Sequence, residues 1–153
     1  DQGRFEEALA LLARACRLFA RIEDRRREAE VQLERAELEL EVLEPAEALE
    51  GYLAVARSAP LDLSPLLRAR AVRGAAWCLV ITEGSERAWS FVAEIRKRWR
   101  WLPCSWEGLA LRRVEGELLL ARDDLSAASD ALIEALDGFL AIGDSLEATA
   151  SAT

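Results

Sequence analysis

The amino-acid sequence predicts an all-α fold, an alpha-solenoid of antiparallel helix hairpins, and three observations support this prediction. Strong helix formers dominate the chain, with only 8 glycines and 4 prolines among 153 residues. Apolar residues recur at helical spacing between short breaks. Small and apolar residues also repeat every forty positions along the chain. A fixed period of this size is typical of repeat proteins, in which each unit buries its apolar face against the next.

Columns of residues spaced forty positions apart keep their chemical character. A column of alanines is followed, four and seven residues later, by two columns that contain only apolar residues. The members are Ala8, Ala48, Ala88 and Ala128, then Leu12, Tyr52, Val92 and Leu132, then Ala15, Val55, Ile95 and Ala135. A column of small residues stands twelve positions before the last three alanines, at Ala36, Ala76 and Gly116. Chance matching in an alanine-rich chain is the alternative, and the unbroken columns argue against it.

Breaks between the apolar segments divide the chain into about seven predicted helices. The expected ranges are about 4–22, 24–43, 45–58, 65–81, 85–100, 105–122 and 125–142. Asp24, Ser64 and Ser105 stand where N-cap residues are expected, because their side-chain oxygens accept hydrogen bonds from backbone N–H groups. We expect Gly143 and Asp144 to end the seventh helix and to begin another.

We expect one domain that covers residues 1–153 and consists of repeat units. The units are 1–23 (partial), 24–60, 64–102, 105–143 and 144–153 (partial). The chain contains no methionine, and both of its ends fall inside a unit. We therefore expect the sequence to be a fragment of a longer array.

The composition disfavours several functional classes. A net charge of −8 is opposite in sign to the basic surface on which nucleic-acid binding usually depends. No segment approaches the ~18 consecutive apolar residues of a membrane-spanning helix. Cys16, Cys78 and Cys104 are odd in number and lack C-x-x-C spacing, which favours free thiols over zinc or redox chemistry. Free thiols are typical of a reducing compartment, so we expect a cytoplasmic protein.

The paired helices and the small-residue columns resemble the tetratricopeptide repeat family, in a long version of about forty residues. The resemblance covers almost the whole chain and includes the closing proline of the family, present once as Pro60. Residues 3–8 and 142–144 look like the turn segments of long bacterial members. The resemblance implies that small residues of the two helices in each unit meet, in the pairs Ala36/Ala48, Ala76/Ala88 and Gly116/Ala128.

The first helix of each unit departs from the family pattern. Gln32, Val72 and Arg112 stand where the family has a tryptophan. First-helix packing should therefore be nonstandard. A different alpha-solenoid and an irregular helical bundle remain alternatives.

No group of residues has the pattern of a catalytic or cofactor site. The chain contains no histidine, so neither a Ser-His nor a Cys-His nucleophile can form. The glycines are scattered singly, so no phosphate-binding loop is expected. The many glutamates between positions 28 and 41 are typical of a solvated helix face. We expect a protein that is not an enzyme and that needs no metal or cofactor.

The resemblance also implies a concave surface lined by the first helix of each unit. Leu33, Leu40 and Leu120 would face this surface. The candidate partner-binding residues on it are Arg70, Arg73, Trp77, Arg113, Glu37 and Glu117. Such a groove would be acidic at one end and basic at the other, and its arginines around an aromatic anchor could hold an acidic peptide or helix. The alternative is that the tryptophan belongs to the core and that the arginines are only solvated.

A second candidate surface mixes cations with aromatic residues. This candidate docking patch consists of Arg96, Arg98, Trp99, Trp101 and Trp106. The mixture is typical of single-stranded nucleic-acid sites, but the acidic remainder of the chain favours burial of the tryptophans between hairpins. Docking of another domain of the same parent chain is the intermediate interpretation.

The sequence therefore predicts a non-catalytic module for protein–protein interaction or scaffolding, which binds a peptide or a partner domain on its concave helical surface. The alternative is the sensor or regulatory arm of a larger bacterial signalling protein or transcriptional regulator. Nucleic-acid binding is the least favoured function, and we expect no membrane partner.

Overall fold

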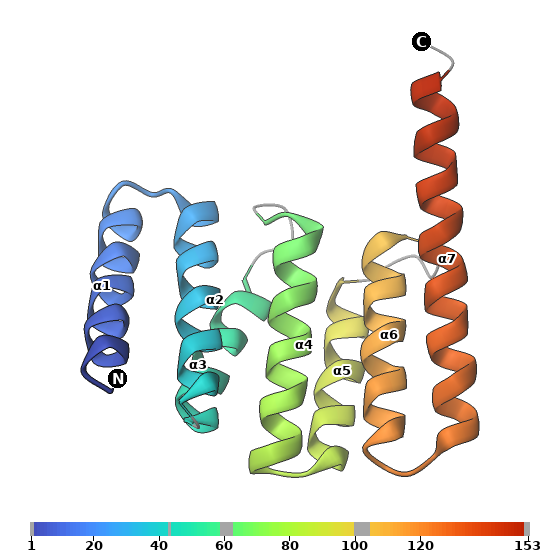
Figure 1. The fold of residues 1–153 in the computed structure, drawn as a ribbon, viewed down its shortest axis with the longest axis horizontal. Coiled ribbons are helices and arrows are strands. Elements are labelled where there is room, and N and C mark those ends of the chain that lie inside the picture. Colours follow the sequence, from blue (N-terminus) through green and yellow to red (C-terminus); the bar gives the residue numbers. More distant parts are fainter. Residues whose placement is uncertain (1, 43, 59–62, 100–104, 152–153) are drawn as a thin grey trace.

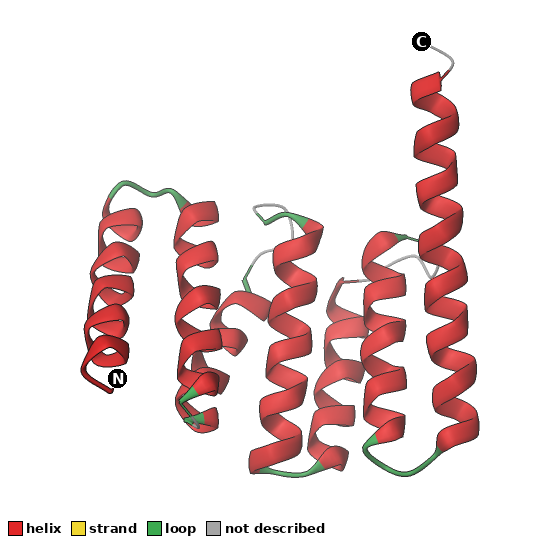
Figure 2. Ribbon diagram, in the orientation of Figure 1, coloured by secondary structure: helices red, strands yellow, loops and turns green. Residues whose placement is uncertain are grey.

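The computed structural model describes residues 2–42, 44–58, 63–99 and 105–151. Within these residues the protein is all-helical, with seven helices and no strand (Figures 1 and 2). The helices are α1 (Gln2–Arg21), α2 (Arg25–Glu41), α3 (Pro45–Ala56), α4 (Pro65–Thr82), α5 (Ser85–Trp99), α6 (Trp106–Leu120) and α7 (Leu125–Ser151). The predicted all-α fold and the predicted number of helices are confirmed.

Each helix packs against the next one along the chain, which gives the molecule a repeat-like arrangement (Figure 1). Helices two positions apart also pack together, because α2 contacts α4 and α4 contacts α6. These three helices therefore lie side by side in one row. The row includes the helices that the sequence predicts as the first helix of each complete unit, so their side chains can contribute to a common surface.

Helix starts follow the capping signals of the sequence. The side chain of Asp24 accepts a hydrogen bond from the backbone N–H of Arg27 at 3.1 Å. Ser64 and Ser105 cap α4 and α6 in the same way, at 3.3 Å and 3.1 Å. Each bond satisfies one of the N–H groups that a helix start leaves without an intrahelical partner.

The seventh helix corrects one prediction. Gly143 and Asp144 do not end it, because α7 continues from Leu125 to Ser151. A glycine inside a helix costs about 1 kcal/mol relative to alanine but leaves the hydrogen-bond pattern intact. The helix formers on both sides of Gly143 are therefore sufficient to continue the helix. In Figure 1 the C-terminal part of α7 extends beyond the ends of the other helices.

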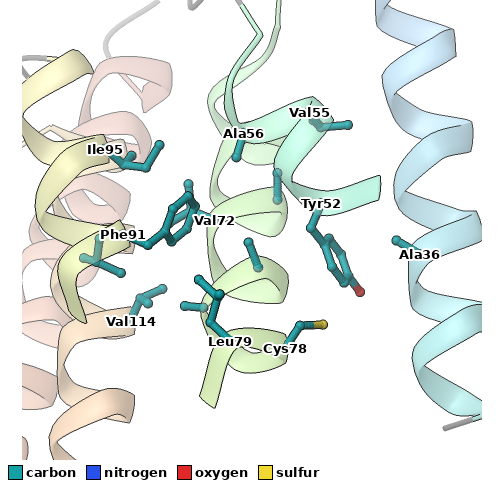
Figure 3. Close-up of a cluster of buried hydrophobic side chains, with 14 of the residues drawn as sticks. Ala36, Tyr52, Val55, Ala56, Val72, Cys78, Leu79, Phe91, Ile95 and Val114 are labelled. Carbon is teal, nitrogen blue, oxygen red and sulfur yellow. The ribbon is translucent and has the colours of Figure 1, made fainter. Parts of the chain in front are cut away.

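The repeated apolar columns form the core of the molecule (Figure 3). Ala48, Ala88 and Ala128 are completely buried. The columns four and seven residues later are also buried in α3 and α5, where each side chain is at most 3% exposed. The corresponding residues of α1 are only half-buried. The forty-residue period therefore marks the side of each second helix that packs against the other helices.

Small residues allow close approach of helices within two units. A Cβ atom added to Gly116 of α6 would lie 2.7 Å from Cγ of Leu132 and 3.4 Å from the carbonyl oxygen of Ala128 on α7. A Cβ atom added to Gly51 of α3 would lie 3.1 Å from Cβ of Ala36 on α2. Ala36 and Gly116, two members of the small-residue column, therefore stand where the facing helix leaves little room for a larger side chain.

Candidate binding groove

A groove of about 710 Å³ lies along the row formed by α2, α4 and α6. Its walls come from these three helices, and α3 contributes one residue. The lining residues are Glu37, Leu40, Tyr52, Arg70, Arg73, Gly74, Trp77, Glu117, Leu120 and Ala121. The volume is within the range of ligand-binding pockets in proteins.

The lining of the groove includes large apolar side chains that are exposed. Trp77 is 50% exposed and Leu120 is 44% exposed. Trp77 is therefore not a core residue, so the alternative interpretation of this tryptophan is wrong. Exposed large apolar side chains in a hollow surface are typical of a site that buries them when a partner binds.

Tyr52 joins the groove to the core. It extends from α3 (Figure 3) and is 3% exposed. Its ring lies against Gly74 of α4. A Cβ atom at position 74 would lie 2.3 Å from Cε1 of Tyr52. Burial is the largest of the causes that raise the pKa of the Tyr52 phenol above its usual range, and the carboxylate of Glu37 adds to the shift. The shift extends the pH range over which the phenol stays neutral, so it remains a hydrogen-bonding group without charge well into alkaline pH.

On the α2 side of the groove, one arginine binds two carboxylates. The Nη2 atom of Arg70 lies 2.8 Å from Oε1 of Glu37 and 3.1 Å from Oε1 of Glu34. Its Nε atom also donates to Glu37, at 3.2 Å. The hydrogen bond to Glu37 is the largest cause that raises the pKa of Arg70 above its usual value. These contacts connect α4 to α2.

On the α6 side, one carboxylate binds two arginines. The Nε atom of Arg73 donates to Glu117 at 2.9 Å and 3.1 Å, one distance for each carboxylate oxygen. The Nε atom of Arg113 donates to Oε1 of the same carboxylate at 3.1 Å. The contact with Arg73 connects α4 to α6, whereas Arg113 and Glu117 lie one turn apart on α6.

The structure brings five of the six candidate partner-binding residues into one groove, namely Glu37, Arg70, Arg73, Trp77 and Glu117. Arg113 does not line the groove but binds Glu117 beside it. The arginines are not merely solvated, since carboxylates of neighbouring helices bind Arg70 and Arg73, and a carboxylate of the same helix binds Arg113. One expectation is wrong, because Leu33 is completely buried and faces the core. Its position on α2 is turned toward the other helices rather than toward the groove.

The sequence patterns did not place Tyr52 or Gly74 at the groove. Tyr52 belongs to a column of core residues, so periodicity predicts that it is buried and does not predict that its side chain also lines the groove. Gly74 did carry a signal, because an isolated glycine inside a helix often marks a close contact.

The residues of the candidate docking patch do not form one surface site, because they bind different parts of the molecule. Arg96 of α5 binds Glu115 of α6, and Glu115 also binds Arg112 at 3.3 Å. Arg98 donates to the backbone carbonyl of Arg57 at 2.9 Å. The ring of Trp106 packs against Phe139 of α7, with ring centroids 5.6 Å apart. The side chain of Trp99 and the whole of Trp101 lie outside the described residues. The arginines and Trp106 therefore participate in contacts between helices.

The described thiols are free. Cys78 is completely buried in α4, and burial raises its pKa to about 11. Cys16 of α1 is half-buried, and Cys104 lies outside the described residues. Among the residues with described positions, no three histidine, cysteine, aspartate or glutamate side chains form a group that could hold a metal ion.

Comparisons with known proteins returned no match to a protein-family model, a curated protein or a solved structure. Among the described helices, none has the length and apolar content needed to cross a membrane.

Proposed function

We propose that this chain is a non-catalytic protein-recognition module that binds a peptide or a segment of a partner domain in the groove. The observation that carries the proposal is the 50% exposed ring of Trp77 within a groove of about 710 Å³. Buried aromatic anchors provide a large share of the binding free energy in protein interfaces. Trp77 has the exposure and the position that such an anchor needs.

The arrangement of the groove supports a peptide ligand. Helices of three successive hairpins line it, so its length follows the row α2, α4 and α6. Leu40 and Leu120 extend the apolar surface on both sides of Trp77. The resemblance to long tetratricopeptide repeats leads to the same proposal, since stacked hairpins present extended concave binding surfaces.

The proposal is tested by selecting short peptides that bind the immobilised protein from a random phage-displayed library. The affinities of the selected peptides are then measured for the wild-type protein, for Trp77→Ala and for Ile81→Ala. Ile81 is the matched control, because it is 53% exposed on the same helix but does not line the groove.

We expect Trp77→Ala to weaken binding about tenfold or more, equivalent to about 1.4 kcal/mol. We expect Ile81→Ala to leave it unchanged. Selected peptides that bind both variants as tightly as the wild-type protein would place recognition elsewhere on the molecule.

A further inference from the structure

Charge is distributed unevenly between the two sides of the groove. On the α2 side, the carboxylates of Glu34 and Glu37 share the single guanidinium of Arg70. The cluster of these three side chains therefore carries a net charge of one negative unit. Glu41, one helical turn after Glu37 on α2, is a further exposed acid at this end.

The α6 side has the opposite excess. The guanidinium groups of Arg73 and Arg113 share the single carboxylate of Glu117. This cluster therefore carries one positive charge in excess. The two clusters carry opposite net charges, and α4 contributes one arginine to each.

In each cluster, the two side chains of like charge are more exposed than the single side chain of opposite charge that binds them. The side chains of Glu34 and Glu37 are 58% and 43% exposed, whereas that of Arg70 is 32% exposed. A ligand at the α2 side therefore meets carboxylates first.

The order of exposure is reversed on the other side. The side chains of Arg73 and Arg113 are 56% and 52% exposed, whereas that of Glu117 is 24% exposed. A ligand at the α6 side therefore meets guanidinium groups first.

Apolar residues line the groove one helical turn after the charged ones, and Trp77 on the central helix α4 lies between the α2 side and the α6 side. Leu40, Trp77 and Leu120 lie in the same groove as Glu37 and Glu117. An apolar ligand group that covers Trp77 would bring its neighbouring groups toward Glu37 on one side and toward Arg73 on the other.

We infer that the groove selects a peptide of opposite charge at its two ends, with a cationic side chain near Glu34 and Glu37 and an anionic side chain near Arg73 and Arg113. A large apolar side chain between them covers Trp77. This inference rests on the proposed function. Complementary charges determine the orientation of a bound partner and disfavour partners that place like charges together.

The test uses four synthetic peptides with the same central phenylalanine. One peptide has lysines on one flank and glutamates on the other. The second has lysines on both flanks, the third has glutamates on both, and the fourth has serines on both. Affinities are measured by fluorescence anisotropy, with the wild-type protein and with Trp77→Ala.

We expect the peptide with opposite charges to bind about tenfold tighter than either peptide with like charges. Each like-charged peptide has one flank that the cluster of the same charge repels. Added salt should reduce this preference, since these charges are solvent-exposed.

Two neutralising variants assign the ends of the peptide to the clusters. Glu34→Gln should weaken only peptides that carry lysines, and Arg113→Gln should weaken only peptides that carry glutamates. Both residues are more than half exposed, so the variants should fold. Glu30→Gln is the matched control on α2, because Glu30 pairs with Arg26 one turn away and does not pair with Arg70.

The outcomes separate the two proposals. If all four peptides bind equally and binding depends on Trp77, the charge inference is overturned and the proposed function stands. If no peptide binds in a Trp77-dependent manner, both proposals are wrong. A preference for one of the like-charged peptides would also overturn the inference.

Discussion

Gly74 of α4 lies directly against the aromatic ring of Tyr52 from α3, with the position of a Cβ atom at residue 74 only 2.3 Å from Cε1 of the ring. Only a residue without a side chain fits there while the ring keeps this position. The contact holds the ring in a position that belongs both to the core and to the lining of the groove.

The first prediction is that Gly74→Ala destabilises the protein. Alanine is favoured over glycine inside a helix by about 1 kcal/mol. The clash with a rigid ring that is 3% exposed should outweigh this gain, because overpacking typically costs about 1–3 kcal/mol. Urea denaturation should therefore show a lower free energy of unfolding. A Gly74→Ala/Tyr52→Leu double variant should show coupling between the two changes, and simple additivity would argue against the contact.

The second prediction concerns the continuity of α7. A Cβ atom added to Gly143 would have no atom within 4 Å, and α7 passes through this residue without a break. Gly143→Ala should therefore leave the stability unchanged or raise it by up to about 1 kcal/mol. The thermal midpoint and the far-UV circular dichroism of the variant measure this effect. A marked loss of stability would indicate that residue 143 adopts a left-handed backbone conformation, as Gly84 does with its φ of +95°.

The third prediction concerns the most buried of the ion pairs between helices in the described part of the chain. Nη2 of Arg68 on α4 lies 2.7 Å from Oε1 of Glu107 on α6, and their side chains are 10% and 17% exposed. Glu107→Gln leaves the buried guanidinium without this carboxylate and should lower the free energy of unfolding by about 2 kcal/mol. Chemical denaturation at neutral pH measures the change.

Glu30→Gln provides the comparison for this ion pair. Glu30 pairs with Arg26 on the surface of α2, where the side chains are 40% and 70% exposed. Exposed pairs typically contribute about 0.5 kcal/mol. Equal effects of Glu107→Gln and Glu30→Gln would show that burial adds nothing to the Arg68–Glu107 interaction.

The fourth prediction is a loss of stability at alkaline pH caused by Cys78. Burial raises the pKa of this thiol to about 11 in the folded protein, whereas the pKa of an unfolded cysteine is about 8.5. Between these two values the unfolded chain releases the proton and the folded chain retains it. The free energy of unfolding should therefore fall, approaching about 1.4 kcal/mol per pH unit once the pH is well above the lower value.

Cys78→Ala isolates this contribution. Urea denaturation of both proteins under reducing conditions, between about pH 8 and pH 10, should show a smaller decline for the variant. Burial also raises the pKa of Cys16, but this thiol is present in both proteins and its effect cancels. Parallel pH profiles would contradict the prediction.

Local signals in the sequence were sufficient to predict most of the fold. A cap such as Ser64 acts within its own helix turn, so its role can be recognised without knowledge of the rest of the molecule. Gly143 misled the prediction because glycine tolerates a helix as well as a turn. Gly84 shows the other outcome, with a positive φ between α4 and α5.

The candidate site was only partly predictable for a related reason. Arg70, Arg73 and Trp77 follow helical spacing, so the sequence alone placed them on one face of a helix. The partners of the arginines are more than thirty positions away in the chain, as for Arg70 and Glu37. Such pairs depend on how neighbouring helices pack, which a period in the sequence does not determine. For the same reason Leu33 was assigned to the wrong side of α2.

The incomplete burial of α1 has a consequence for local opening. None of its side chains with described positions, residues 3–21, is fully buried, whereas α3 and α5 each contribute fully buried side chains to the core. Its contacts are made chiefly with α2. Segments with few buried contacts exchange their amide hydrogens through local opening, at a free energy below that of global unfolding. Amides of α1 should therefore exchange before those of α3 and α5, and Cys16 should become accessible to thiol reagents while Cys78 remains protected.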